Sequence, residues 1–167
     1  MNTSSKNTQS IVIRPAQTGE EEVLYELICK LAHYERNDIS KLPLTKESLR
    51  QYGFGDKRFF YTEFASSEDK VIGYALYYYG FSSNQGRPIL YLEDLYVKPE
   101  YREQGIGTEF LKKLATYAIK EGCCRLQWHV LAWNESAINF YRKLGGFLKE
   151  DSIQVRLEDL QKLADRQ

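Results

Sequence analysis

Several residue types that build sites or membrane anchors are scarce in this chain of 167 residues. Its three cysteines are an odd number, and Cys123 and Cys124 are neighbours that could hardly bridge without strain, so we expect reduced thiols and a cytoplasmic protein. Its two histidines, His33 and His129, lack zinc-ligand spacing with these cysteines, so we expect no metal. The start is polar and no apolar run approaches the ~18 residues of a membrane span, so we expect no signal peptide and no membrane association.

Net charge is also absent, because 23 basic residues balance 23 acidic ones. Without a global positive field we expect no nucleic-acid partner. The chain is 43% hydrophobic, 14% aromatic and 28% charged, which is typical of a folded globular protein and excludes general disorder. Its length suits one domain. We therefore interpret residues 1–10 as a disordered tail and residues 11–167 as a single domain.

The N-terminal half alternates helical and extended patterns. Apolar residues at positions 11–13 before a proline predict a strand, and helical spacing predicts an amphipathic helix over 20–34. Thr45 and a nearby acid predict a short second helix that ends at Gly53 and Gly55. Strand-like stretches then follow at 59–65, 71–79 and 89–97, and the short polar links between them predict an antiparallel meander.

The C-terminal half implies a crossover. Residues 105–120 carry apolar side chains on one helical face, and we then expect a strand at 126–131, a helix at 135–144, a last strand at 153–157 and a short helical tail. A helix between two strands returns the chain in the same direction, so one strand pair is predicted to be parallel. The expected fold class is α+β (mixed α/β), with a largely antiparallel, twisted mixed sheet flanked by helices.

The segment 101–108 joins a predicted strand to a helix start, where unpaired backbone N–H groups and the helix dipole favour an anion such as phosphate. Gly105 and Gly107 allow a ligand to approach the backbone, and Arg102 could add a charged contact. Taken alone, two glycines there are more often a plain turn. The sequence lacks the Gly-Lys-Ser/Thr and Gly-x-Gly-x-x-Gly patterns of nucleotide-binding loops.

Four sequence blocks in order resemble a known family. They are Leu-Tyr-Leu-Glu-Asp-Leu-Tyr-Val, Arg-x-x-Gly-x-Gly, Trp-Asn-Glu and Asn-Phe-Tyr-Arg-Lys-Leu-Gly, and together they resemble the GNAT N-acetyltransferases over nearly the whole chain. Residues 31–35, 52–55 and 91–94 resemble the diamine acetyltransferase branch, which includes spermidine/spermine and thialysine N-acetyltransferases. The resemblance implies a GNAT-like fold, acetyl-coenzyme A (acetyl-CoA) as donor and usually a homodimer.

The resemblance also implies which residues hold the donor. Its pyrophosphate would lie on the glycine turn and its pantetheine beside the fourth strand, where a backbone N–H near Leu95 would stabilise the thioester oxygen. Asn134 is by its own sequence context a plausible helix N-cap, and the two roles are compatible. The implied cofactor residues are Leu95, Tyr96, Val97, Arg102, Glu103, Gln104, Gly105, Ile106, Gly107, Thr108, Asn134, Ser136 and Tyr141.

An amine attacks a thioester only when neutral, and a lysine-like amine of pKa ~10.4 is disfavoured in that form by roughly 4 to 5 kcal/mol at pH 7. Glu93, a carboxylate within an otherwise apolar and aromatic strand, is the candidate proton acceptor, directly or through water. A salt-bridged or solvated strand residue is the alternative. Spacing alone makes Tyr141 a core aromatic, whereas the resemblance makes it the acid for the leaving thiolate. The resemblance implies that Tyr34, Glu35, Glu93 and Asp94 bind the acceptor. A solvated helix end is the equal alternative for Tyr34 and Glu35.

The chain departs from the family pattern in places that concern the acceptor and the donor. Ser83 and Gln85 stand where polyamine-specific members carry an acidic residue and a tryptophan, and Glu103 replaces a glycine of the phosphate turn. The acceptor therefore stays open among lysine analogues, short diamines, polyamines and other small amines. Two further readings are acetylation of a peptide or protein amine, and a non-catalytic acetyl-CoA-binding regulatory module. The presence of both Glu93 and Tyr141 argues against the second.

Overall fold

The computed structural model describes residues 10–165, which form two compact units, one ending at His129 and one beginning at Val130. Most of the expected N-terminal tail, residues 1–9, lies outside the described residues. The first unit contains a five-stranded sheet in the order β1-β2-β3-β4-β5. The first four strands are antiparallel neighbours and β5 runs parallel to β4, which confirms the predicted mixed sheet.

The strands follow the predicted pattern with small shifts at their ends. Glu68 and Asp69 both have positive φ, of 48° and 63°, and make the two-residue turn between β2 and β3 that suits strand twist. The strands are β1 (Ile11–Pro15), β2 (Tyr61–Ser67), β3 (Lys70–Ser82), β4 (Arg87–Val97) and β5 (Leu126–Gln127).

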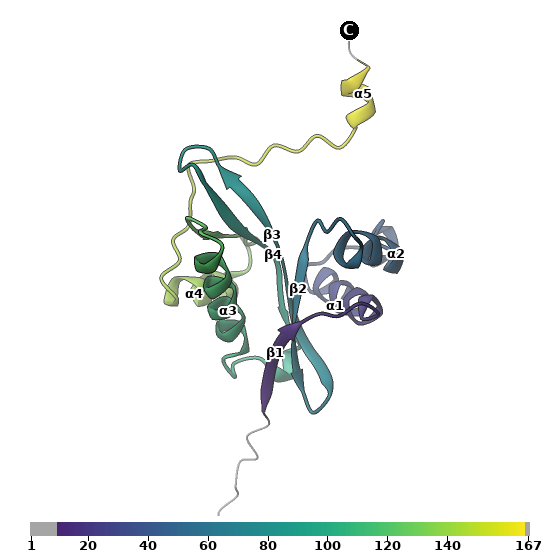
Figure 1. Ribbon diagram of the computed structural model, residues 1–167, viewed down its shortest axis with the longest axis vertical. Helices are drawn as coiled ribbons and strands as arrows, with labels where there is room; N and C mark the ends of the chain where they lie inside the picture. Colours follow the sequence, from purple (N-terminus) through teal and green to yellow (C-terminus); the bar gives the residue numbers. More distant parts are fainter. Residues whose placement is uncertain (1–9, 166–167) are drawn as a thin grey trace, which may run out of the picture. The chain divides into compact units, whose positions relative to one another are not determined.

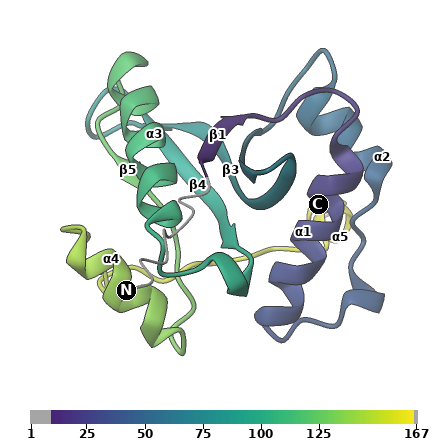
Figure 2. The ribbon, with the colours of Figure 1, turned by 90° about the horizontal axis from the view of Figure 1, so that it is seen from below.

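Helices cover both faces of this sheet, with α1 and α2 on one face and α3 on the other (Figures 1 and 2). Thr45 caps α2 as predicted and, with Ser48, forms a capping box. The helix then continues through a π-helical turn that ends at the two expected glycines. The helices are α1 (Glu21–Tyr34), α2 (Lys46–Leu49), the π-turn η2 (Arg50–Phe54) and α3 (Ile106–Lys120), with 3-10 turns η1 (Ile39–Lys41) and η3 (Pro99–Tyr101).

The core between α1 and the sheet is built from the same apolar residues whose helical spacing predicts α1. Leu24, Leu27 and Leu31 recur at helical spacing and are buried. With Leu49 they pack against side chains of three neighbouring strands, namely Phe64, Tyr74, Leu76 and Tyr96. Because these contacts span β2, β3 and β4, they fix the end of α1 relative to the C-terminal end of β4.

On the other face, α3 is held to the sheet by a buried charge. Lys113 Nζ lies 3.0 Å from Glu63 Oε2 and donates a hydrogen bond of 2.7 Å to the Ile13 carbonyl of β1. Tyr117 donates a bond of 3.2 Å to Glu63 Oε1, and the Glu63 side chain is only 3% exposed. These contacts link α3 to β1 and β2, and so position the glycine turn at the start of the helix.

Two predicted strands differ from the structure. β5 covers two residues instead of 126–131, and its ladder pairs only Leu90 with Leu126 and Tyr91 with Gln127. Pairing ends just before the irregular part of β4 described below, which bends the strand edge.

The predicted strand at 153–157 is wrong, because these residues form no strand, and Ile153 and Val155 are 92% and 88% exposed. Alternating apolar residues form a strand only against a partner, and the described chain supplies none here. In the second unit, α4 (Glu135–Lys143) and α5 (Leu160–Ala164) confirm the two predicted helices. No helix within residues 10–165 has the length and apolar character that crossing a membrane requires.

Candidate active site

Strand β4 is irregular at its two acidic residues. Asp94 pairs with Leu76 of β3. The next pair along the ladder is Leu92 with Tyr77, so Glu93 is the extra residue of a β-bulge. A bulge bends its strand and re-aims the neighbouring side chains, and bulges are frequent beside active sites. Consecutive side chains of a regular strand point to opposite faces of the sheet. The bulge therefore permits Glu93 and Asp94, although neighbours, to lie on the same face.

The bulge brings three predicted acceptor residues together. Burial raises the pKa of Glu35, just after α1, and the charge of Glu93 raises it further. Burial also raises the pKa of Asp94 to about 6, and the charges of Glu93 and Glu35 add to the rise. A hydrogen bond of 2.9 Å donated by Tyr74 lowers this pKa, but by less than burial raises it. We call Glu35, Glu93 and Asp94 the acidic cluster. Its negative charge attracts a cation, and Asp94 holds a proton up to about pH 6.

Arg102 connects the end of α1 to the turn after β4. Its guanidinium lies 4.9 Å from the ring centre of Tyr34 and 5.7 Å from that of Tyr96. Its Nε donates a hydrogen bond of 2.9 Å to the Val97 carbonyl. The structure therefore places Tyr34, expected at the acceptor, against Arg102, expected at the phosphate. Tyr96 is buried, which leaves its backbone rather than its ring for a ligand along β4.

The glycine turn begins α3 as expected. Gly105 is the residue before the helix and has φ +83°, a conformation that favours glycine. A Cβ built there would meet no other atom within 4 Å, so the space beside Gly105 is open. Glu103, two residues earlier, has φ +61° and is strained for a residue with a side chain. The first backbone N–H groups of α3, including those of Gly107 and Thr108, have no acceptor within the helix.

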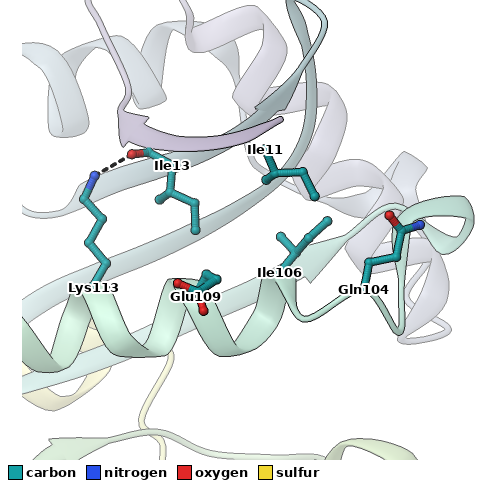
Figure 3. A pocket seen from close by; sticks show the side chains of 6 residues that line it. All are labelled: Ile11, Ile13, Gln104, Ile106, Glu109 and Lys113. Atoms are coloured by element: carbon teal, nitrogen blue, oxygen red, sulfur yellow. Dashed lines mark hydrogen bonds between the residues drawn. The ribbon is translucent and has the colours of Figure 1, made fainter. Parts of the chain in front are cut away.

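A cavity of about 310 Å³ lies on the β1 side of α3 (Figure 3). Ile11 and Ile13 of β1 face Ile106 across it, and Gln104, Glu109 and Lys113 complete its lining. Two of the predicted cofactor residues, Gln104 and Ile106, border this cavity, and the acidic cluster does not. Within residues 10–165, no group of three or more His, Cys, Asp and Glu side chains could hold a metal ion.

The second unit contains the remaining predicted residues. Asn134 accepts a hydrogen bond of 3.2 Å from the Ala137 N–H, so it is the N-cap of α4 as its context indicates. Ser136 lies exposed in the first turn of this helix. Burial raises the pKa of Tyr141 to about 12, and its ring centre is 5.2 Å from that of Phe140. The Tyr141 phenol therefore keeps its proton at neutral pH.

Three residues near the acidic cluster were not expected from sequence. They are Tyr74, which bonds Asp94, and the stacked pair Tyr78 and Tyr91. The signal for the first two was present, because Tyr74 and Tyr78 are four apart on a strand and so share a face. Finding their partners needs the register of β3 against β4, and the bulge alters that register.

Comparison with known proteins gives one family. The sequence pattern of the acetyltransferase (GNAT) family matches residues 23–147. Thialysine N-epsilon-acetyltransferase of Bos taurus is 41% identical over 143 residues, which cover 81% of this chain and 83% of that protein. Spermidine/spermine N(1)-acetyltransferase-like protein 1 of Homo sapiens is 37% identical over 140 residues, which cover 80% of this chain and 20% of that protein.

Solved structures agree on the architecture. An integron cassette protein from the mobile metagenome of V. cholerae superposes with a TM-score of 0.78 at 28% identity, covering 94% of this chain and 99% of that one. A metagenomic aminoglycoside acetyltransferase from soil superposes with a TM-score of 0.74 at 19% identity, covering 89% and 95%. At this identity the second comparison shows a shared fold alone.

Proposed function

This chain belongs to the GNAT acetyltransferase family, and on that premise we propose that it moves an acetyl group from acetyl-CoA to a primary amine of a small molecule. The acceptor classes are diamines, polyamines and lysine analogues such as thialysine, which the names of its relatives indicate. The observation that carries the proposal is the acidic cluster at the β4 bulge, in the same unit as the glycine turn.

The glycine turn fits the diphosphate of the donor. Gly105 has open space beside it, and the unpaired N–H groups that begin α3 are the usual partners of a phosphate. Acetyl-CoA supplies the acetyl group as an activated thioester. We assign residues 102–108 to the diphosphate and the backbone of Leu95–Val97 to the pantetheine. The family resemblance further assigns Asn134, Ser136 and Tyr141 to the donor.

The acidic cluster does two things for the acceptor. Three carboxyl groups attract an ammonium group, and one of them must then take its proton, since deprotonation at pH 7 costs roughly 4 to 5 kcal/mol. We assign the proton transfer to Glu93, directly or through water, because the bulge directs it to the side of Glu35 and Asp94. Asp94, tied to Tyr74, remains as the partner that holds the cation.

Tyr141 serves the departing sulfur. Because burial raises the pKa of Tyr141 to about 12, its Oη carries a proton throughout the neutral range. A phenol positioned near a thiolate can then donate that proton, which typically contributes 10²- to 10⁴-fold to a rate. The account thus has one base, Glu93, and one acid, Tyr141.

The proposal is tested by the release of free thiol from acetyl-CoA in the presence of lysine analogues, diamines, polyamines and a peptide. We expect turnover with a small amine carrying a second positive charge. Turnover with the peptide alone would favour a peptide N-acetyltransferase. A cofactor-binding module would bind acetyl-CoA and show no amine-dependent turnover, and that result overturns the proposal.

The Tyr141→Phe variant separates chemistry from binding. It is expected to keep acetyl-CoA binding and lose at least about 100-fold in kcat. Equal turnover would remove Tyr141 from the mechanism.

Three broader expectations belong to the same proposal. Residues 11–167 act as one N-acetyltransferase domain, which the family match across both units supports. The protein is cytoplasmic, which its three free cysteines support. It forms a homodimer, which the exposed Ile153 and Val155 support because exposed apolar side chains often mark an interface. Sedimentation equilibrium distinguishes the dimer from a monomer of 19.5 kDa.

A further inference from the structure

Arg102 follows the turn η3 after β4, and its half-buried side chain is held by contacts with α1 and β4. The guanidinium carbon lies 4.9 Å from the ring centre of Tyr34, the last residue of α1, and 5.7 Å from that of Tyr96 in β4. Its Nε donates a hydrogen bond of 2.9 Å to the Val97 carbonyl. Two aromatic rings and one backbone acceptor thus fix the direction of this side chain.

The outer donors of the Arg102 guanidinium remain available to a ligand. Within residues 10–165, Arg102 forms no ion pair, and its Nη1 and Nη2 groups donate no hydrogen bond. A guanidinium stays charged at every physiological pH, and its planar fork of N–H groups matches the oxygens of a phosphate. A fixed arginine without an acidic partner, at the start of the glycine turn, therefore favours an anion.

The two rings that contact Arg102 differ in their surroundings. Tyr96 is 5% exposed and packs in the core against α1, so its place is set by the fold. Tyr34 is 38% exposed, so its ring covers the guanidinium from the side nearer to solvent. A cation is attracted to an aromatic face, and a side chain that is ordered before binding loses less conformational entropy when its ligand arrives. The contact with Tyr34 is thus the one that orders Arg102 without being part of the core.

We propose that Tyr34 is a positioning residue for the donor, which holds the Arg102 guanidinium in place for the diphosphate of acetyl-CoA. This inference rests on the proposed function, which assigns residues 102–108 to that diphosphate. It moves Tyr34 from the acceptor side, where the resemblance puts it, to the donor side. Glu35 stays with the acidic cluster, because consecutive side chains at a helix end point about 100° apart. The end of α1 therefore serves both substrates through two neighbouring side chains.

The test measures the Kd of coenzyme A by calorimetry, and KM for a diamine, in variants of the full chain. Tyr34→Leu removes the aromatic face and is expected to weaken coenzyme A binding at least about five-fold, while KM for the diamine changes by less than about two-fold. Tyr34→Phe keeps the ring and removes only the hydroxyl, so it is expected to bind coenzyme A as the wild type does. Tyr61→Leu is the matched control, because Tyr61 is 39% exposed and stacks on Tyr77 of β3, and it should leave coenzyme A binding unchanged.

A double-mutant cycle tests whether Tyr34 acts through Arg102. Arg102→Gln is expected to weaken coenzyme A binding by itself, because it removes the charge. In that background Tyr34→Leu should weaken binding by less than about two-fold more, since the ring then has no cation to hold. An undiminished effect of Tyr34→Leu in the Arg102→Gln background would overturn the inference.

Two other results would also overturn it. A raised KM for the diamine in Tyr34→Leu, with coenzyme A binding unchanged, would return Tyr34 to the acceptor side and leave the proposed function intact. Weaker coenzyme A binding in Tyr34→Phe would assign the effect to the hydroxyl rather than to the ring. Absence of turnover with every amine would instead overturn the proposed function, and the coenzyme A affinities of the variants would still decide this inference.

Discussion

At the scale of single residues, Asp94 shows how the site opposes stability. Its carboxyl has a pKa of about 6 in the fold, above the ~3.9 of an unfolded chain. Between these values the folded state binds more protons, so stability falls as pH rises through this window. The fold therefore carries a buried negative charge at neutral pH that stability alone would not retain. This cost is consistent with a binding role for the cluster.

Replacing Asp94 by asparagine is expected to stabilise the protein at pH 7.5, by up to about 2 kcal/mol, because the amide can still accept from Tyr74 and carries no charge. At pH 4.5 the folded carboxyl is protonated while most unfolded carboxyls are still ionised, so the gain should fall to roughly one third of its value at pH 7.5. Urea denaturation at both pH values measures this. If the Asp94→Asn variant were less stable than the wild type at both pH values, burial of the carboxylate would have no net cost in folding free energy.

Glu103 is a second residue whose surroundings predict the effect of replacing it, here on the binding of coenzyme A. Its φ of +61° is unfavourable for a residue with a Cβ, and its carboxylate stands in the turn assigned to the diphosphate. We expect Glu103→Gly to relieve the backbone strain and remove a like charge. Tighter binding of coenzyme A, several-fold by calorimetry, is the predicted outcome. Unchanged or weaker binding of coenzyme A would contradict the assignment of the diphosphate to this turn.

At the scale of elements, one buried ion pair contributes to the contact between α3 and the sheet. Lys113→Met would leave Glu63 buried without its cation and is expected to cost about 3 kcal/mol of unfolding free energy. Adding Glu63→Gln should restore more than half of that loss, since the uncompensated charge is then gone. Lys112→Met, one residue away on the exposed face of the same helix, is the control and should cost less than about 1 kcal/mol. Equal losses for both lysines would contradict the role of the buried pair.

The elements also show where sequence patterns suffice. The helices α1 and α3 were predictable because their apolar stripes are long and lie within one stretch of sequence. Asn134 was predictable as an N-cap because capping, too, depends only on neighbouring residues. The bulge at Glu93 was not, because it depends on how β4 pairs with β3. The length of β5 escaped prediction as well, because it depends on how far β5 pairs with β4.

At the scale of the whole molecule, the resemblance of sequence blocks predicted the family and the fold class, and the comparisons confirm both. Glu35, Glu93 and Asp94 were each expected at the acceptor, and in the structure the charge of Glu93 acts on both of the other carboxyl groups. Their role in binding the acceptor stays a prediction. The contacts of Arg102 with Tyr34 and of Tyr91 with His129 depend on tertiary packing, which a linear motif does not contain.

The central claim is that Glu93 at the bulge takes the proton of a small cationic amine. Its most direct test is kcat/KM for the best diamine in Glu93→Gln, with Glu121→Gln, an exposed residue after α3, as the matched control. The account predicts a loss of at least about 100-fold in Glu93→Gln that shrinks as pH approaches the pKa of the amine, with acetyl-CoA binding retained. Glu121→Gln should match the wild type. Equal kcat/KM for the two variants across this pH range would contradict the account.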